Sequence, residues 1–266
     1  MKYAFMSFST PKLTLKEMLT LARELGYDGI EPRLDAGHAH GVEVAAEPDE
    51  RDKIRRAADE GGVALACLAV SCQFADPAQA PTMIAEAHER IDLAGDVGAP
   101  RLRVFGGAFP ENVTREQAVE QVAGSLRALA DHAAERGVTV CMETHDAWCD
   151  PRHVAEVMKR VDHPAVAVNW DALHPVREGL ATIDESFEAL RPWIRHLHVH
   201  DALTPQRRFE LVPMGEGVAD HKRVIELLKT ISFDGYLSGE WIDWEPHETH
   251  LPRELATLKG YERDLR

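Results

Sequence analysis

Residues 139–171 read TVCMETHDAWCDPRHVAEVMKRVDHPAVAVNWD and contain two β-rich runs on either side of a helical pattern. The runs are Thr139–Glu143 and Ala165–Asp171. Between them, Pro151–Arg160 has the amphipathic pattern of a helix that covers one face of a sheet. The stretch therefore predicts a strand–helix–strand unit with parallel strands.

The same alternation continues in both directions along the chain. Strands are expected at Tyr3–Ser7, Gly29–Pro32, Ala64–Val70, Arg101–Phe105, Thr139–Glu143, Ala165–Asp171, Ile194–His200 and Gly235–Glu240. Helices are expected at Leu13–Leu25, Pro48–Glu60, Met83–Val97, Arg115–Arg136, Pro151–Arg160, Ile183–Leu190, His221–Thr230 and Pro252–Arg263. Several helices end at a glycine suited to a left-handed cap, namely Gly26, Gly61, Gly98 and Gly137.

Unbroken strand–helix pairs along the whole chain predict a (β/α)8 TIM barrel that forms one domain over residues 1–266. The alternative is an open doubly wound sheet, which often carries a Gly-rich phosphate loop after its first strand. Here Ser-Thr-Pro-Lys follows that strand instead, so the closed barrel is favoured. The longest irregular stretches, 35–47 and 202–219, follow strands, where barrel enzymes build their active sites.

The composition excludes several kinds of partner. The chain of 266 residues is 44% hydrophobic and 28% charged, as in ordinary globular proteins, and its formal net charge is -15. Such acidity disfavours nucleic acid and membrane surfaces as partners. We read the first residues as a strand rather than a signal peptide and see no apolar run of membrane-spanning length. The four cysteines lack C-x-x-C spacing, so we expect reduced thiols and a cytoplasmic location. Barrels of this kind often form dimers or tetramers, so a homo-oligomer stays open.

Four consecutive predicted strands end in side chains that can bind a metal. These are Glu143, Asp171, His198 and Glu240. Any one of them alone is more often structural, but four on successive strands favour one shared divalent ion, because buried charges need a partner or a metal. Three carboxylates and one imidazole form a mostly oxygen-donor set. It suits Mn²⁺ best, with Mg²⁺, Co²⁺ or Zn²⁺ as alternatives.

Short motifs in a fixed order extend this pattern along the chain. They are Gly26-Tyr-Asp-Gly-Ile-Glu31, Arg103-Val-Phe-Gly-Gly107, Met142-Glu143, Asn169-Trp-Asp171-Ala-Leu-His174, His196-Leu-His198-Val-His-Asp201, Met214-Gly-Glu-Gly217 and Asp234-Gly-Tyr-Leu-Ser-Gly-Glu240. In these motifs the whole chain resembles the xylose isomerase-like barrel superfamily. The resemblance is to its sugar phosphate isomerase/epimerase group, which includes ketose 3-epimerases, hydroxypyruvate isomerase and inosose dehydratase. The motifs are specific for the superfamily and not for a single reaction.

The resemblance implies a site and an activity. The metal ligands of the family fall on the same four residues, and in the epimerases the first and last carboxylates, here Glu143 and Glu240, also form the acid/base pair. A substrate-oxygen contact falls on His174. The implied function is a divalent-metal-dependent isomerase or epimerase of a keto-sugar or related polyhydroxy carbonyl compound. It would act by proton transfer through a metal-stabilised enediolate.

Several histidines depart from the familiar pattern. His145 lies two residues beyond Glu143, so on a strand it points the same way, into the barrel mouth. There it acts either as a general base, which favours a metal-dependent lyase or dehydratase of a keto-sugar or keto-glycoside, or as a hydrogen-bond partner of a ligand carboxylate. His200 stands where lysine is common, and His196 is expected to pack one layer deeper.

Other residues are candidates for substrate contacts. Arg33 either clamps the substrate or, as we favour, pairs with Glu31. Trp241 offers an aromatic face to a sugar ring, and Arg207, with its neighbour Arg208, suits a phosphate or carboxylate. A glycine-rich phosphate cradle is lacking, so an unphosphorylated sugar is preferred.

Two other functions are weaker alternatives. An endonuclease IV-like DNA-repair hydrolase would need more metal ligands, which Glu31, His38 and His40 could supply, but net acidity opposes DNA binding. For His38 and His40 we expect solvent-exposed loop positions, with a mobile lid as the alternative. A non-catalytic sugar-binding module would not need an acid/base pair beside a metal.

Overall fold

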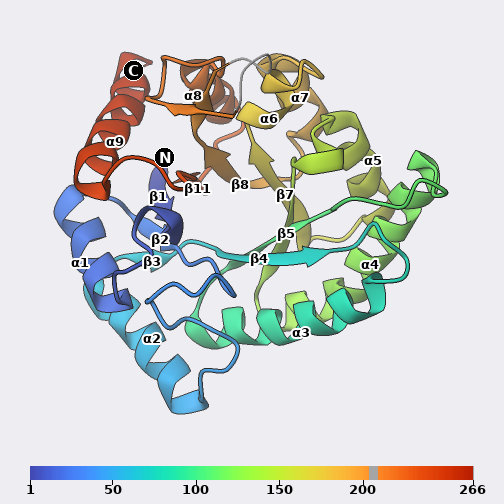
Figure 1. The fold of residues 1–266 in the computed structure, drawn as a ribbon, viewed down its shortest axis with the longest axis horizontal. Helices are drawn as coiled ribbons and strands as arrows, with labels where there is room; N and C mark the ends of the chain where they lie inside the picture. The colour runs from blue at the N-terminus through green and yellow to red at the C-terminus, as the bar shows by residue number, and fades with distance from the viewer. Residues whose placement is uncertain (204–208, 266) are drawn as a thin grey trace.

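The computed structural model describes residues 1–203 and 209–265, and its centre is a ring of parallel strands with helices outside (Figure 1). The strands of the main sheet are β1 Lys2–Met6, β2 Gly29–Glu31, β3 Ala64–Leu65, β4 Leu68–Gln73, β5 Arg101–Phe105, β6 Thr139–Glu143, β7 Val166–Asp171, β8 Ile194–Val199 and β11 Tyr236–Gly239. Their order in the sheet is β3-β2-β1-β11-β8-β7-β6-β5-β4. The predicted alternation of strands and helices is therefore confirmed.

The sheet closes into a barrel beside β2 and β4. Arg33 and Ala69 form a parallel bridge there, and the Ala69 amide donates to Pro32 O over 2.9 Å. β3 and β4 together correspond to the third predicted strand, which is interrupted between Leu65 and Leu68. The nine strands are thus the eight of a (β/α)8 barrel with one of them divided, which confirms the expected fold class.

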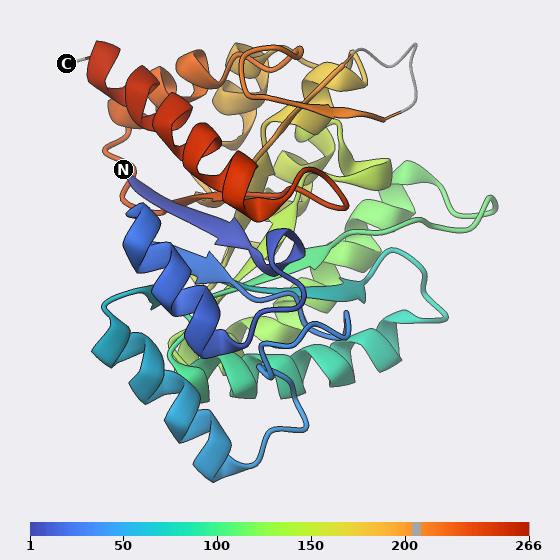
Figure 2. The same cartoon turned by 60° about the vertical axis from the view of Figure 1, so that its left-hand side comes forward.

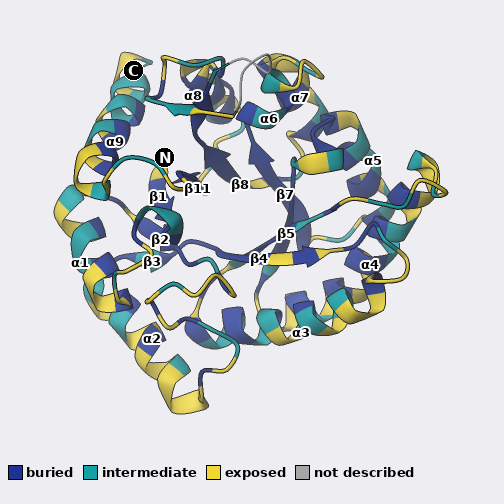
Figure 3. Cartoon of the chain, viewed as in Figure 1, coloured by how far each residue is buried: buried dark blue, intermediate teal, exposed yellow. Residues whose placement is uncertain are grey.

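The helices surround the barrel and turn their buried faces toward it (Figures 2 and 3). They are α1 Leu15–Leu25, α2 Pro48–Gly61, α3 Ala80–Val97, α4 Arg115–Glu135, α5 Pro151–Val161, α6 Leu173–Arg177, α7 Ile183–Leu190, α8 His221–Thr230 and α9 His247–Asp264. α1 begins after Thr14, which forms a capping box with Glu17, so local sequence fixes the start of this helix. In the described part of the chain, we find no helix with the length and apolarity needed to cross a membrane.

Some boundaries differ from the sequence-based expectation. α2 runs through Gly61, and the left-handed cap with φ 66° is Gly62. α9 begins at His247, so Pro252 lies inside the helix rather than at its start. The stretch after β8 contains a short antiparallel pair, β9 Asp201–Ala202 with β10 Leu211–Val212. The two short 3-10 helices, η1 Ser7–Ser9 and η2 Asp146–Trp148, and the short α6 were not expected.

The cysteines fit the expectation of reduced thiols. All four are free and buried, namely Cys67, Cys72, Cys141 and Cys149. Burial raises the pKa of the Cys141 thiol to about 12, which makes it a poor nucleophile.

Candidate functional site

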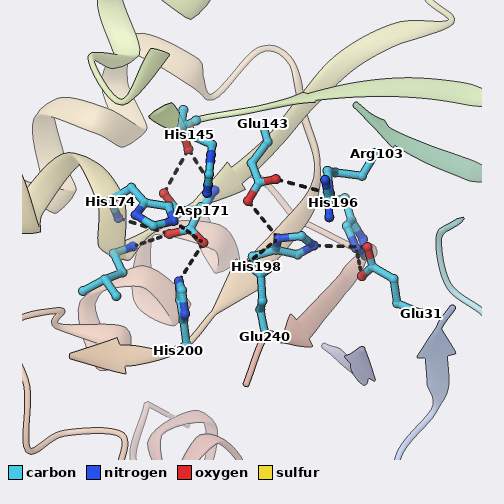
Figure 4. A network of polar contacts seen from close by, with 12 residues as sticks. Glu31, Arg103, Glu143, His145, Asp171, His174, His196, His198, His200 and Glu240 are labelled. Atoms are coloured by element: carbon cyan, nitrogen blue, oxygen red, sulfur yellow. Dashed lines mark hydrogen bonds and ion pairs between the residues drawn. The ribbon is translucent and has the colours of Figure 1, made fainter. Parts of the chain in front are cut away.

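The four predicted metal ligands converge at the C-terminal ends of neighbouring strands (Figure 4). Glu143, Asp171, His198 and Glu240 each offer one ligand atom, and these atoms lie within 4.8 Å of one another. His198 Nδ1 is 2.9 Å from Glu143 Oε1 and 3.3 Å from Glu240 Oε2. The first three side chains are 0% exposed and Glu240 is 7% exposed. The arrangement is a buried cluster of donors of the kind that holds a cation.

A bulge in β8 brings its histidines into this cluster. Val168 pairs with Ile194, whereas the next residue, Asn169, pairs with His196, so Arg195 is the extra residue on β8. After the bulge Asp171 and His198 are register partners. Since side chains alternate along a strand, His196 and His198 then face the barrel interior, and both are fully buried.

Arg103, from β5, forms a buried ion pair with Glu143. Its Nε lies 3.2 Å from Glu143 Oε2, its Nη1 donates to Val70 O over 3.0 Å, and its guanidinium lies 4.1 Å from the Phe105 ring centroid. Arg103 is 1% exposed. Sequence reasoning did not single it out, although an arginine in the otherwise apolar strand core of β5 was the available signal.

Glu31 holds the other side of His198. Glu31 Oε1 is 3.1 Å from His198 Nε2, and its Oε2 is 2.8 Å from His196 Nε2. Burial alone would raise the pKa of Glu31, but the two histidines outweigh burial and hold that pKa well below its usual value. Glu31 therefore fixes the ring of His198 so that Nδ1 faces Glu143 and Glu240.

The contacts of Glu31 with His196 and His198 bear on our expectations for Arg33 and His196. We favoured Arg33 as the ion-pair partner of Glu31, which is wrong because histidines fill that place. Arg33 instead donates to the carbonyls of Leu34 and Ala69 and to Ser71 Oγ. His196 is packed behind the cluster, as expected.

Charges within the cluster set its protonation. Burial lowers the pKa of His198, but Glu143, Glu31 and Glu240 outweigh it and raise this pKa well above the usual value. Burial likewise raises the pKa of Glu240, yet His198 brings it down to about 2. Glu240 is thus ionised at neutral pH, as metal binding requires of a carboxylate ligand.

Asp171 is anchored by the start of α6. Its Oδ1 accepts from the amides of Leu173, over 2.8 Å, and of His174, over 3.1 Å. Its Oδ2 lies 2.9 Å from His200 Nε2 and 3.8 Å from His174 Nε2. Burial opposes ionisation, but the two histidines hold the pKa of Asp171 below its usual value. His200 is therefore a hydrogen-bond partner of a candidate ligand.

His145 lies at the barrel mouth beside His174. The two ring centroids are 4.7 Å apart, and His145 Nδ1 lies 2.9 Å from Asp146 Oδ1. The side chain is 30% exposed, unlike those of the candidate ligands. Both histidines line a cavity of about 350 Å³, whose lining includes none of the four candidate ligands.

The remaining candidates are placed differently. Trp241 is 1% exposed and packs against His250, with ring centroids 5.0 Å apart. Arg207 lies outside the described residues. His40 is buried and not exposed to solvent as expected, because its Nε2 bonds to Arg33 O and its Nδ1 accepts from the Val42 amide. His38 Nδ1 is 2.8 Å from Ser7 Oγ, and its ring contacts that of Phe8.

Two curated relatives cover most of the chain. One is the 3-dehydroshikimate dehydratase of Bacillus anthracis, which is 23% identical over 91% of this chain and 91% of the relative. The other is the L-ribulose-5-phosphate 3-epimerase UlaE of Salmonella paratyphi B, which is 27% identical over 85% of this chain and 81% of the relative.

Solved structures share the fold. The probable 3-DHS dehydratase AsbF of Bacillus anthracis has a TM-score of 0.81 at 22% identity, covering 97% of this chain and 99% of that one. The IOLI protein with a bound zinc atom has a TM-score of 0.81 at 19% identity, covering 100% and 98%. A Mycobacterium smegmatis protein in complex with magnesium has a TM-score of 0.72 at 20% identity, covering 100% and 98%.

A family model described as xylose isomerase-like TIM barrel matches residues 19–261, which extend from α1 into α9. The match includes every strand of the barrel except β1 and all four candidate ligands. The chain therefore belongs to the xylose isomerase-like TIM barrel family.

Proposed function

We propose that the protein is a divalent-metal-dependent enzyme that moves a proton on the carbon next to a carbonyl group. Its substrate is a small keto-sugar or related polyhydroxy carbonyl compound, and the reaction is an isomerisation or epimerisation. The observation that carries the proposal is the convergence of Glu143, Asp171, His198 and Glu240 within 4.8 Å. The similarity to a sugar-phosphate 3-epimerase supports the reaction class.

The buried charges of the cluster fit a divalent ion. Three carboxylates share the space with one arginine, so that a divalent ion bound with a neutral His198 would balance the two remaining negative charges. The four converging side chains would hold the ion, and Mn²⁺ is our first choice because oxygen donors dominate. Relatives of the same fold with magnesium or zinc support a divalent cation in general. When bound, such an ion supplies Lewis-acid polarisation of the substrate carbonyl.

The side chains around the cluster divide the work of proton transfer. Glu143 and Glu240 form the acid/base pair, and Arg103 fixes the orientation of Glu143 through the 3.2 Å contact. His174 is a hydrogen-bond partner for a substrate oxygen, and Arg33 stands at the mouth for a hydroxyl or carboxylate. Return of the proton to the opposite face inverts the carbon, whereas return to the neighbouring carbon moves the carbonyl.

A specific observation also favours a lyase or dehydratase. Glu143 Oε2 is held by Arg103, whereas His145 is partly exposed in the mouth, with Asp146 beside Nδ1. His145 Nε2 could take the proton next to the carbonyl. The C–O bond at the β carbon would then break, and the leaving group would depart as water or an alcohol after gaining a proton. The similarity to a dehydratase supports this second candidate.

The composition supports our proposals for partners and location. We propose a small-molecule substrate and no nucleic-acid partner, because the net charge is -15. A cytoplasmic location is consistent with four free, buried cysteines.

Proton exchange in deuterated water tests the function. The protein is first stripped with a chelator, then loaded with Mn²⁺, Mg²⁺, Co²⁺ or Zn²⁺ and incubated with a panel of ketoses and keto-glycosides. NMR should detect metal-dependent deuterium at the carbon next to the carbonyl, together with a new stereoisomer or carbonyl position. Release of water or an alcohol supports the lyase instead. A protein that binds the sugars without exchange under every metal is a binding module, and the proposal fails.

A further inference from the structure

Thr144 follows the candidate ligand Glu143 directly, at the point where β6 ends. The neighbouring strand β7 ends at Asp171, which is also a candidate ligand, and both carboxylates reach the same cluster (Figure 4). Thr144 is 0% exposed. Its buried hydroxyl therefore lies where the two strands deliver their ligands, although a hydroxyl is not itself one of the converging donors.

The Thr144 hydroxyl holds the backbone of Asp171 on both sides of its Cα atom. The Asp171 amide donates to Thr144 Oγ1 over 2.9 Å, and the same hydroxyl donates to Asp171 O over 3.0 Å. The Thr144 amide donates to Asn169 O over 3.2 Å. One residue thus makes three hydrogen bonds to the last three residues of β7.

These bonds extend the pairing of β6 and β7 to the rim of the barrel. The last register pair of the two strands is Glu143 with Asn169, so Asp171 lies beyond it. A hydroxyl can donate and accept at once, which lets one side chain bind both the N–H and the C=O of Asp171. The Thr144 side chain therefore fixes the separation of the two backbones at the level of the ligands.

Each of the two carboxylates also has a restraint of its own. Glu143 Oε2 lies 3.2 Å from Arg103 Nε, and Asp171 Oδ1 accepts from the amides of Leu173 and His174. These contacts orient each carboxylate on its own strand, but none of them joins Glu143 to Asp171. The Thr144 hydroxyl supplies this link, because it is attached to the residue after Glu143 and bonded to Asp171.

We propose that Thr144 is a positioning residue that sets the spacing of Glu143 and Asp171 for the divalent ion. Contacts that support a ligand contribute strongly to metal affinity, and their loss typically costs roughly 10–100-fold. This inference deepens the proposed function and rests on it for the presence of the ion. It adds a buried hydroxyl that acts through two ligands and touches neither the ion nor the substrate.

Variants of Thr144 that keep or remove the hydroxyl test the inference. Thr144→Val keeps the shape and removes the hydroxyl, and calorimetric titration of the chelator-stripped protein should show at least about tenfold weaker Mn²⁺ binding. Thr144→Ser keeps the hydroxyl and should restore affinity close to that of the wild type. The electron paramagnetic resonance spectrum of bound Mn²⁺, which reports the symmetry of its ligands, should change in the valine variant and not in the serine variant.

Ser125→Ala is the matched control. Ser125, on α4, is 2% exposed, and its hydroxyl donates to Gln121 O over 2.9 Å. Removing either buried hydroxyl should lower stability in urea, but only Thr144→Val should weaken Mn²⁺ binding and change the spectrum. Equal losses of affinity in both variants would mean that the effect follows from lost stability, and would overturn the inference.

The remaining outcomes separate this inference from the proposed function. Unchanged affinity and spectrum in Thr144→Val overturn the inference, and so does a serine variant as weak as the valine variant. Thr144→Ala replaces a valine variant that does not fold; if neither folds, the hydroxyl maintains the fold itself and the inference fails. A wild type that binds no divalent ion overturns both proposals. The expected affinities without proton exchange on any ketose support the role of Thr144 and reject only the proposed function.

Discussion

Arg103 Nε lies 3.2 Å from Glu143 Oε2, and both side chains are buried at the base of the barrel mouth. Glu143 Oε1 faces His198, and the other oxygen, Oε2, lies against the positive charge of Arg103. A carboxylate held in this way has one oxygen left to face the centre of the cluster. Arg103 is thus a positioning residue for a candidate metal ligand.

Replacing Arg103 should expose the cost of a buried, unpaired carboxylate. We expect Arg103→Met to lower the free energy of unfolding by about 3–5 kcal/mol in the presence of a chelator. Saturating Mn²⁺ should restore part of this loss, because the ion supplies positive charge beside Glu143. Urea denaturation of both proteins, with and without metal, measures both effects. A variant as stable as the wild type in chelator would show that the pair contributes nothing.

Removing a ligand carboxylate should weaken metal binding. We expect Glu143→Gln to lower Mn²⁺ affinity by more than about tenfold, since loss of supporting partners alone typically costs 10–100-fold. Activity should be lost as well. Isothermal titration calorimetry and elemental analysis measure affinity and stoichiometry. Glu178→Gln is the control, because Glu178 lines the neighbouring 350 Å³ cavity but is not among the converging ligands. An active, metal-replete Glu143→Gln protein would refute the assignment.

Replacing His145 should separate the two candidate reactions. If its imidazole is the base, His145→Gln should lower kcat by about 10²–10⁴-fold, the usual contribution of general base catalysis. The affinity for Mn²⁺ should stay unchanged, since His145 is outside the four-residue cluster. Steady-state kinetics with the substrate identified by the exchange experiment give the answer. If kcat falls by less than about threefold, His145 is not the base, and Glu143 and Glu240 carry out the proton transfer.

His40 should make stability depend on pH. Burial lowers its pKa to about 4, and its Nδ1 must stay unprotonated to accept from the Val42 amide. The unfolded chain, in which His40 titrates near 6.5, binds the proton more readily than the folded protein between these two values. The contribution of His40 to the free energy of unfolding is therefore complete above pH 6.5 and is lost toward pH 4. The loss is about 3 kcal/mol.

The variant His40→Asn tests this prediction, because asparagine keeps an acceptor for the Val42 amide and does not titrate. Denaturation at pH 8 should give similar stabilities for the variant and the wild type. Between pH 6.5 and 4 the variant should lose less stability than the wild type. Identical pH profiles for the two proteins would mean that His40 takes up its proton in the folded state as easily as in the unfolded chain.

Local sequence patterns predicted most strands and helices, and they failed where tertiary packing determines the bounds of an element. Strands such as β5 and β6 and the helix α7 have the predicted bounds. α6 was missed because it is a five-residue helix whose first amides are bound by Asp171, a contact that periodicity does not reveal. The early start of α9 was missed because its first turn is stabilised by burial of His250 between Trp241 and Trp244, not by a capping residue.

The sequence by itself determined the barrel and the four side chains that meet at its mouth. Alternating strand and helix patterns imply parallel strands, whose carboxyl ends share one rim, so strand-end residues such as Glu143 and Asp171 had to be neighbours. Only the tertiary structure decided the partner of each buried charge: Arg103 for Glu143, and His196 with His198 for Glu31. Glu31 and His198 are 167 positions apart, and their contact depends on strand register and on the β8 bulge, which local sequence patterns do not reveal.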